Sequence, residues 1–179
     1  MAAQGGPGQL SGLSMPSIRG DVPVTLSLLD RLTDDDLKRS GELHLTRSQS
    51  VRKLRDAVRR DLEWLLNTRQ PFVPAPDGSE LQESLYMYGL PDITSMSVAN
   101  IRDRQRLAQA IQAAVLKFEP RIANPRVNLV SGGEDKTPTL RFAIEGMLRV
   151  EPNPEHVSFD TVLELANGEY TVQGEARAR

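Results

Sequence analysis

The sequence contains no cysteine, which excludes a disulfide framework and any thiolate metal site and agrees with a reducing compartment. It has two histidines, His44 and His156, and neither has a spacing typical of zinc ligands. Aromatic residues make up only 4% of the 179 residues, so a core must rest mainly on Leu, Val, Ile and Ala. The formal net charge is -2, whereas a nucleic-acid-binding protein usually has a clear basic excess. We therefore expect no metal, no cofactor and no nucleic-acid partner.

Long apolar runs are also missing. No run approaches the roughly 20 residues that are needed to cross a bilayer. Residues 1–20 have neither the basic leader nor the apolar segment of a secretory signal, and Gly, Ser, Gln and Pro are abundant there. We therefore expect a flexible N-terminal tail over 1–24, one domain over 25–175, a cytoplasmic location and no direct membrane insertion.

The spacing of apolar residues predicts two main helices. The first runs over 50–67, with Ser48 or Ser50 as its N-cap. The second runs over 98–118, with Ser97 as its cap and Ile101 in its apolar stripe. Between them, 70–96 is rich in Pro and Gly and is expected to hold a short helix at 79–88. A further amphipathic stretch at 25–32 is too short to be a stable helix alone, so we expect it to dock on its own domain or on a partner.

After the second helix the apolar period changes from 3.6 to 2. This pattern predicts strands at 126–130, 140–150, 157–165 and 169–173, with a turn at 131–136. The dipeptide Asn167-Gly168 is typical of a tight hairpin. The predicted fold class is therefore α+β: two main helices followed by an antiparallel β-meander.

Nothing in the sequence resembles a catalytic motif. It contains neither a nucleophile elbow nor a phosphate-binding glycine loop, and both histidines are expected in surface loops. The prediction is a protein that is not an enzyme and has no small-molecule substrate. The basic side chains of the first helix fit either a solvated face or a docking surface for acidic partners. They are Arg52, Lys53, Arg55, Arg59 and Arg60.

The most distinctive segment is Glu119-Pro120-Arg121, at the end of the second helix. Proline cannot continue the helix, so Glu119 emerges at a C-terminus, where the helix dipole disfavours a carboxylate by roughly 0.3–1 kcal/mol. Arg121 can offset this charge with a bidentate fork. Two interpretations stay open: an intramolecular latch between helix and sheet, or a socket that holds a neighbouring subunit. The second expects Arg121→Ala to leave the isolated fold nearly intact.

Four stretches resemble the baseplate wedge family of contractile tails, which includes phage wedge proteins and the type VI secretion branch, TssE. The segment Phe118-Glu119-Pro120-Arg121-Ile122 resembles the signature of the family. The other three stretches resemble motifs of the TssE branch. They are Leu28–Leu32, Asp61–Arg69 and Ser84–Asp92. The resemblance covers about residues 25–173.

This resemblance implies a structural subunit of the cytoplasmic baseplate, assembled at the inner membrane, on which the contractile sheath starts to polymerise. Its partners would be the wedge subunits TssF, TssG and TssK and the sheath subunits TssB and TssC. Glu119, Pro120 and Arg121 would form the protein interface. The sheet would resemble the handshake region of the sheath, which links subunits by adding strands across chains. The alternatives are a phage or phage-derived tail subunit, a peptidoglycan-cleaving muramidase and a small regulatory adaptor.

Overall fold

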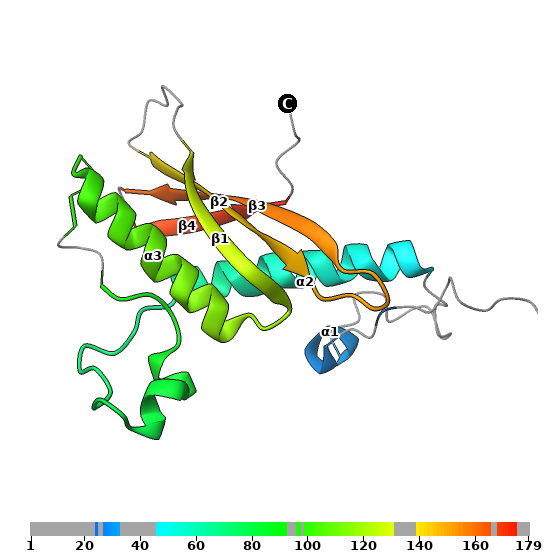
Figure 1. Cartoon of the computed structure of the whole chain (residues 1–179), viewed down its shortest axis with the longest axis horizontal. Coiled ribbons are helices and arrows are strands. Elements are labelled where there is room, and N and C mark those ends of the chain that lie inside the picture. Colours follow the sequence, from blue (N-terminus) through cyan, green and yellow to red (C-terminus); the bar gives the residue numbers. More distant parts are fainter. Residues whose placement is uncertain are drawn as a thin grey trace, which may run out of the picture.

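The chain folds into two layers, with helices packed on one face of an antiparallel sheet (Figure 1). The computed structural model describes residues 24, 27–32, 46–92, 96–97, 99–130, 139–165 and 168–174. The helices are α1 (Leu28–Leu32), α2 (Arg47–Asn67) and α3 (Ile101–Phe118), with two 3-10 turns, η1 (Glu80–Glu83) and η2 (Leu85–Met87). The strands are β1 (Ile122–Val130), β2 (Thr139–Leu148), β3 (Glu155–Glu164) and β4 (Glu169–Gln173). The α+β prediction is confirmed.

The sheet is a meander with the order β1-β2-β3-β4, in which every neighbouring pair is antiparallel. Alternate residues of β2 and β3 are buried, as expected for a sheet with one covered face. Phe142, Ile144 and Phe159 point from this face into the core, where they join Leu62 of α2 and Ile111 of α3. The two main helices and the sheet therefore share one core.

Both helix starts differ from the prediction. The cap of α2 is Thr46 rather than Ser48 or Ser50: its side chain accepts from Gln49 N–H, and the Gln49 side chain accepts from Thr46 N–H. The cap of α3 is Asn100 rather than Ser97, because its Oδ1 accepts from Arg102 N–H at 2.9 Å. Ile101 is consequently the first helical residue, and 59% of its surface is exposed. It does not belong to the buried stripe.

Strand β1 begins four residues earlier than predicted, because the chain passes through a bulge instead of a break. The register with β2 shifts between Ala123 and Arg126, and Asn124 has a φ of 52°. Gly146 of β2 lies beside this bulge, and a Cβ there would stand 2.4 Å from Ile122 Cγ2. The close approach of β1 therefore requires glycine at position 146.

Other expectations have mixed outcomes. The helix predicted at 79–88 consists of the two 3-10 turns, and His156 is an exposed residue of β3 instead of a loop residue. The tail before Val24, His44, the turn at 131–136 and Asn167 lie outside the described residues. Gly168 is described and has a φ of 72°, as a tight turn requires.

Candidate functional site

Glu119 sits at the C-cap of α3, at the point where the chain turns into the sheet. Its N–H donates to Val115 O at 2.9 Å, which is the last helical bond. Pro120 has no N–H with which to extend the helix, and Ile122 N–H instead donates to Glu119 O at 3.1 Å. This turn leaves only 4% of Glu119 exposed. A buried carboxylate at a helix C-terminus needs a compensating charge.

Arg121 supplies that charge through a bidentate contact. Its Nε donates to Glu119 Oε1 at 2.6 Å, and its Nη2 donates to Glu119 Oε2 at 2.5 Å. The backbone N–H of Arg121 also donates to Glu119 Oε1, at 3.3 Å. Paired charge-assisted bonds of this kind fix the plane of the guanidinium as well as its position.

A second carboxylate, from α2, holds the same guanidinium. Arg121 Nη2 donates to Asp61 Oδ2 at 2.6 Å. The backbone of Arg121 is held too, because its carbonyl accepts from Arg149 N–H at 2.8 Å, just after β2. Arg121 therefore joins α2, the end of α3 and the sheet, as the latch interpretation expects.

The ion pairs continue from Asp61 to the N-terminal helix α1. Arg60 donates to Asp61 Oδ1 from Nη2 at 2.9 Å and from Nε at 3.1 Å. Its Nη2 also donates to Asp30 Oδ1 at 2.8 Å, and the Ser27 hydroxyl donates to the other oxygen of Asp30. We call the series Asp30, Arg60, Asp61, Arg121 and Glu119 the charge network. Its signs alternate from end to end.

The network perturbs the titration of its members and of one neighbour. Burial lowers the pKa of Arg121, but its bonds to Glu119 and Asp61 outweigh burial and hold this pKa above the ordinary value. Burial raises the pKa of Asp30, but hydrogen bonds from Ser27 and Arg60 and the positive charge of Arg60 bring the net pKa below its ordinary value. Burial, followed by the charges of Asp61 and Glu119, raises the pKa of Tyr88.

The Nη1 edge of the Arg121 guanidinium is not used by either carboxylate. Its Nη1 donates to none of the described residues, and 26% of the side chain is exposed, against 5% for Glu119. The other two nitrogens are saturated by Glu119 and Asp61. The guanidinium is therefore held in place, and the two N–H groups of Nη1 have no partner among the described residues.

The three residues predicted from the sequence come together, and three more join them. Asp30, Arg60 and Asp61 were not predicted, because their pairing depends on how α1 and α2 pack against the α3–β1 turn. Arg60 had been assigned to the basic face of the first helix. That face is largely used internally: Arg55 pairs with Glu155 at 3.3 Å, and Arg59 donates to Val172 O at 3.2 Å. Arg52 and Lys53 remain exposed.

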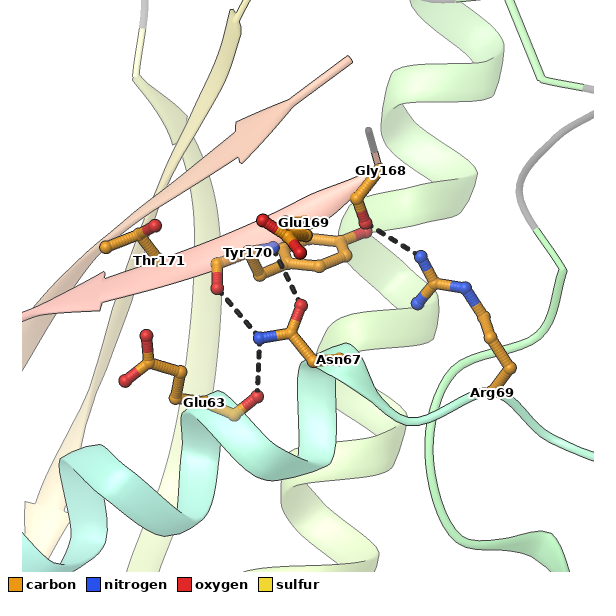
Figure 2. Close-up of a pocket in the computed structure, with 7 residues that line it drawn as sticks. All are labelled: Glu63, Asn67, Arg69, Gly168, Glu169, Tyr170 and Thr171. Carbon is orange, nitrogen blue, oxygen red and sulfur yellow. Dashed lines mark hydrogen bonds between the residues drawn. The ribbon is translucent and has the colours of Figure 1, made fainter. Parts of the chain in front are cut away.

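A separate hollow of about 500 Å³ lies between the end of α2 and β4 (Figure 2). Asn67 crosses it: its Nδ2 donates to Tyr170 O at 2.8 Å, and its Oδ1 accepts from Tyr170 N–H at 2.8 Å. Arg69 Nη2 donates to Gly168 O at 2.9 Å. These bonds occupy backbone groups at the outer edge of β4. The hollow contains none of the three interface residues predicted from the sequence, Glu119, Pro120 and Arg121.

Within the described part of the chain, no cluster of His, Asp and Glu could hold a metal ion. No described helix is both long enough and apolar enough to span a bilayer.

A family model described as baseplate wedge protein gp25 matches residues 52–153, more than half of the chain. The chain belongs to the baseplate wedge protein family. This is the family of TssE in type VI baseplates, and its members are structural parts of contractile tails rather than known enzymes. The matched range contains Asp61, Glu119 and Arg121 and ends before β3. A search of curated proteins found no match.

Proposed function

We propose that this wedge-family protein is a structural subunit of a type VI secretion baseplate. It joins the wedge complex with TssF, TssG and TssK at the cytoplasmic face of the inner membrane and supports assembly of the TssB–TssC sheath. One observation carries the proposal: three of the four stretches that resemble the family contribute to the charge network, and the fourth packs beside it. Asp30, Asp61 and the Glu119–Arg121 pair are members of it, and Tyr88 packs on Phe118 with ring centroids 5.2 Å apart.

Within this function, Glu119, Pro120 and Arg121 form the protein interface. Glu119 and Asp61 hold the guanidinium, Pro120 sets the turn, and Arg121 Nη1 makes the contact with a carboxylate or carbonyl of the neighbouring subunit. Pre-organisation by two carboxylates lowers the entropy that Arg121 loses on binding. Arg121 then acts both as the latch within the chain and as the residue that contacts the neighbouring subunit.

A paired substitution separates these two uses. Arg121→Ala alone leaves Glu119 as a buried, unpaired charge, so a loss of assembly could reflect unfolding. Glu119→Gln combined with Arg121→Gln removes both charges and allows a neutral amide pair, while Asp61 keeps Arg60. We expect this double variant to fold but to lose incorporation into the wedge complex. A folded double variant that assembles normally would refute the interface.

Within this proposal, a strand of the sheath is added at β1, the edge strand on the opposite side of the sheet from β4. In an antiparallel ladder, alternate residues turn their N–H and C=O groups away from the neighbouring strand. Tyr170 of β4 does so, and Asn67 occupies both of its groups. On β1, Val127 N–H reaches Gln112 Oε1 of α3 at 3.4 Å, so Val127 and Leu129 face outward. Leu129 has no bond beyond the sheet to any described residue, so the edge is open to an added strand at this residue, whereas Gln112 occupies the N–H of Val127.

Leu129→Pro tests this edge. Proline is tolerated where a strand N–H faces solvent, so the fold should persist while pairing with an added strand is blocked. Leu129→Ala is the matched control, because it removes the side chain and keeps the N–H. Sheath assembly should fail with proline and proceed with alanine. Equal assembly by both variants would rule out strand addition at β1.

The whole proposal is tested by co-expression of the chain with the remaining wedge subunits from its own genome. We expect a stoichiometric complex. A stable monomer that never associates with them would reject the proposal, and a single complex with one partner and no further assembly would favour the regulatory adaptor. Neighbouring capsid or lysis genes would instead indicate a phage or phage-derived tail. Clearing of a cell-wall suspension would indicate a muramidase, and we expect none.

A further inference from the structure

Residues 70–92, which we call the lobe, project away from the two layers (Figure 1). The two ends of the lobe meet at a closed neck. Gln70 N–H donates to Leu90 O at 2.9 Å, and Leu90 N–H donates to Thr68 O at 2.9 Å. The Gln70 side chain closes the same neck, with Nε2 donating to Gly89 O at 2.9 Å and to Met87 O at 3.1 Å. The lobe is therefore a long loop whose two ends are bonded together, and long loops in compact domains are often functional.

The lobe is held in one shape. The Tyr86 hydroxyl donates to Val73 O at 3.0 Å, which places the segments around 73 and 86 side by side. Lys117, in the last turn of α3, donates to Gln82 O. At the neck, Gly89 has a φ of 103°, and a Cβ there would stand 2.4 Å from Thr68 O. The neck and these bonds together fix the shape of the lobe.

Three apolar side chains of the lobe, which we call its apolar anchors, are strongly exposed. Phe72 is 99% exposed, Leu85 79% and Val73 66%. Single exposed apolar residues are ordinary, but here a complete Phe ring and two aliphatic side chains belong to segments that lie side by side. Rigid aromatic and aliphatic anchors of this kind carry most of the energy of protein interfaces.

The lobe is also acidic. Its sequence holds four carboxylates and no Lys, Arg or His, a formal charge of -4 in a chain whose total is -2. Three of the carboxylates, Asp77, Glu80 and Glu83, are exposed on the same lobe as the apolar anchors. A basic rim on the partner would complement this charge and would accelerate association.

We infer that the lobe is a second docking element, which inserts Phe72 and Leu85 into an apolar pocket rimmed by Lys and Arg side chains on another baseplate subunit. This inference rests on the proposed function. It adds a contact that is separate from Arg121, made by apolar burial instead of ion pairing.

The test measures binding of the full chain to an immobilised complex of the other wedge subunits, expressed without this chain. Phe72→Ser and Leu85→Ser should each weaken binding roughly 10- to 100-fold, as expected for losing one buried apolar anchor. Glu80→Lys combined with Glu83→Lys should slow association, and added salt should slow the wild type in the same way. Ile101→Ser is the matched control, because Ile101 is 59% exposed and lies about 24 Å along α3 from Lys117, at 1.5 Å per residue.

The outcomes separate the two proposals. If the wild-type chain does not bind the complex, the proposed function fails and this inference falls with it. If wild type, Ile101→Ser and both lobe variants bind equally, the proposed function stands and the lobe inference is overturned. Loss with Phe72→Ser and Leu85→Ser, but not with Ile101→Ser, is the expected result.

Discussion

The charge network and the lobe lie next to each other, yet they use opposite kinds of chemistry. The network buries Glu119 and saturates most of its donors and acceptors within the chain, and of the guanidinium nitrogens of Arg121 only Nη1 is without a partner among the described residues. The lobe leaves Phe72 almost fully exposed on a closed, rigid neck. The network should therefore matter for both stability and assembly, whereas the exposed apolar anchors of the lobe should matter for assembly alone.

This difference follows from what each group loses when it is left without a partner. A buried carboxylate without its cation is costly even in the isolated chain, so the network must be satisfied internally. An exposed Phe costs the folded state little, because it is exposed in the unfolded chain as well. The predictions below test this contrast, from the largest expected effect to the smallest.

Arg121→Ala should lower the free energy of unfolding by about 2–4 kcal/mol, because it leaves Glu119 buried and unpaired. This revises the expectation from the sequence of a nearly intact fold. Chemical denaturation of the purified chain measures the change. Arg106→Ala is the control, because Arg106 is 72% exposed in its 3.6 Å pair with Asp103, and it should cost less than about 1 kcal/mol. Equal losses would mean that the network contributes no more than a surface pair.

Gly89→Ala should cost about 2–4 kcal/mol, because the overlap of the new Cβ with the Thr68 backbone adds to the strain of a positive φ. Gly78→Ala, at a φ of 74° with nothing within 4 Å, should cost only about 1–2 kcal/mol for backbone strain. Thermal unfolding of both variants gives the difference. If Gly78→Ala lowers stability as much as Gly89→Ala, the neck is not the closely packed base of the lobe that the account requires.

Asp30→Asn should remove a small, pH-dependent part of stability, below about 1 kcal/mol. The folded pKa of Asp30 is lowered, so its contribution is fully present above the ordinary value of 3.8 and is lost as pH falls through the lowered folded pKa. Denaturation of wild type and variant from pH 6 to pH 2 measures this. The two curves should converge at the acid end; a constant gap would exclude the ion pair as the cause.

Phe72→Ser should change the free energy of unfolding by less than about 0.5 kcal/mol, since the ring has almost no contact in the isolated chain. Leu90→Ser is the buried counterpart at the neck of the lobe, with 0% exposure, and should be strongly destabilising. Differential scanning calorimetry on both variants is sufficient. A large loss of unfolding free energy with Phe72→Ser would show that the ring packs within the chain. The contrast between the network and the lobe would then fail.

The sequence predicted the layers better than the ends of the elements. The fold class follows from strong local periodicity, which tertiary packing reinforced. Thr46 and Gln49 have the Thr-x-x-Gln spacing of a capping box, but two serines nearer the apolar stripe are equally good cap residues by type. The early start of β1 was missed because Asn124-Pro125 resembles a break, and only the pairing with β2 identifies it as a bulge.

The site could be predicted only in part. Glu119 and Arg121 are two residues apart, so local geometry already suggested that they pair. Asp61 lies 60 positions before Arg121, and no local rule brings them together. The exposure of Phe72 was equally hidden, because an apolar residue in a proline-rich stretch can lie inside or outside.

The central claim is that the network holds Arg121 for contact with a neighbouring subunit. A structure of the assembled wedge complex tests it most directly, through the distance from Arg121 Nη1 to the nearest atom of another chain. We predict an oxygen acceptor on that chain about 2.7–3.2 Å away, with the bonds to Glu119 and Asp61 retained. An Nη1 that faces solvent in the assembled complex would contradict the account and leave Arg121 as a latch alone.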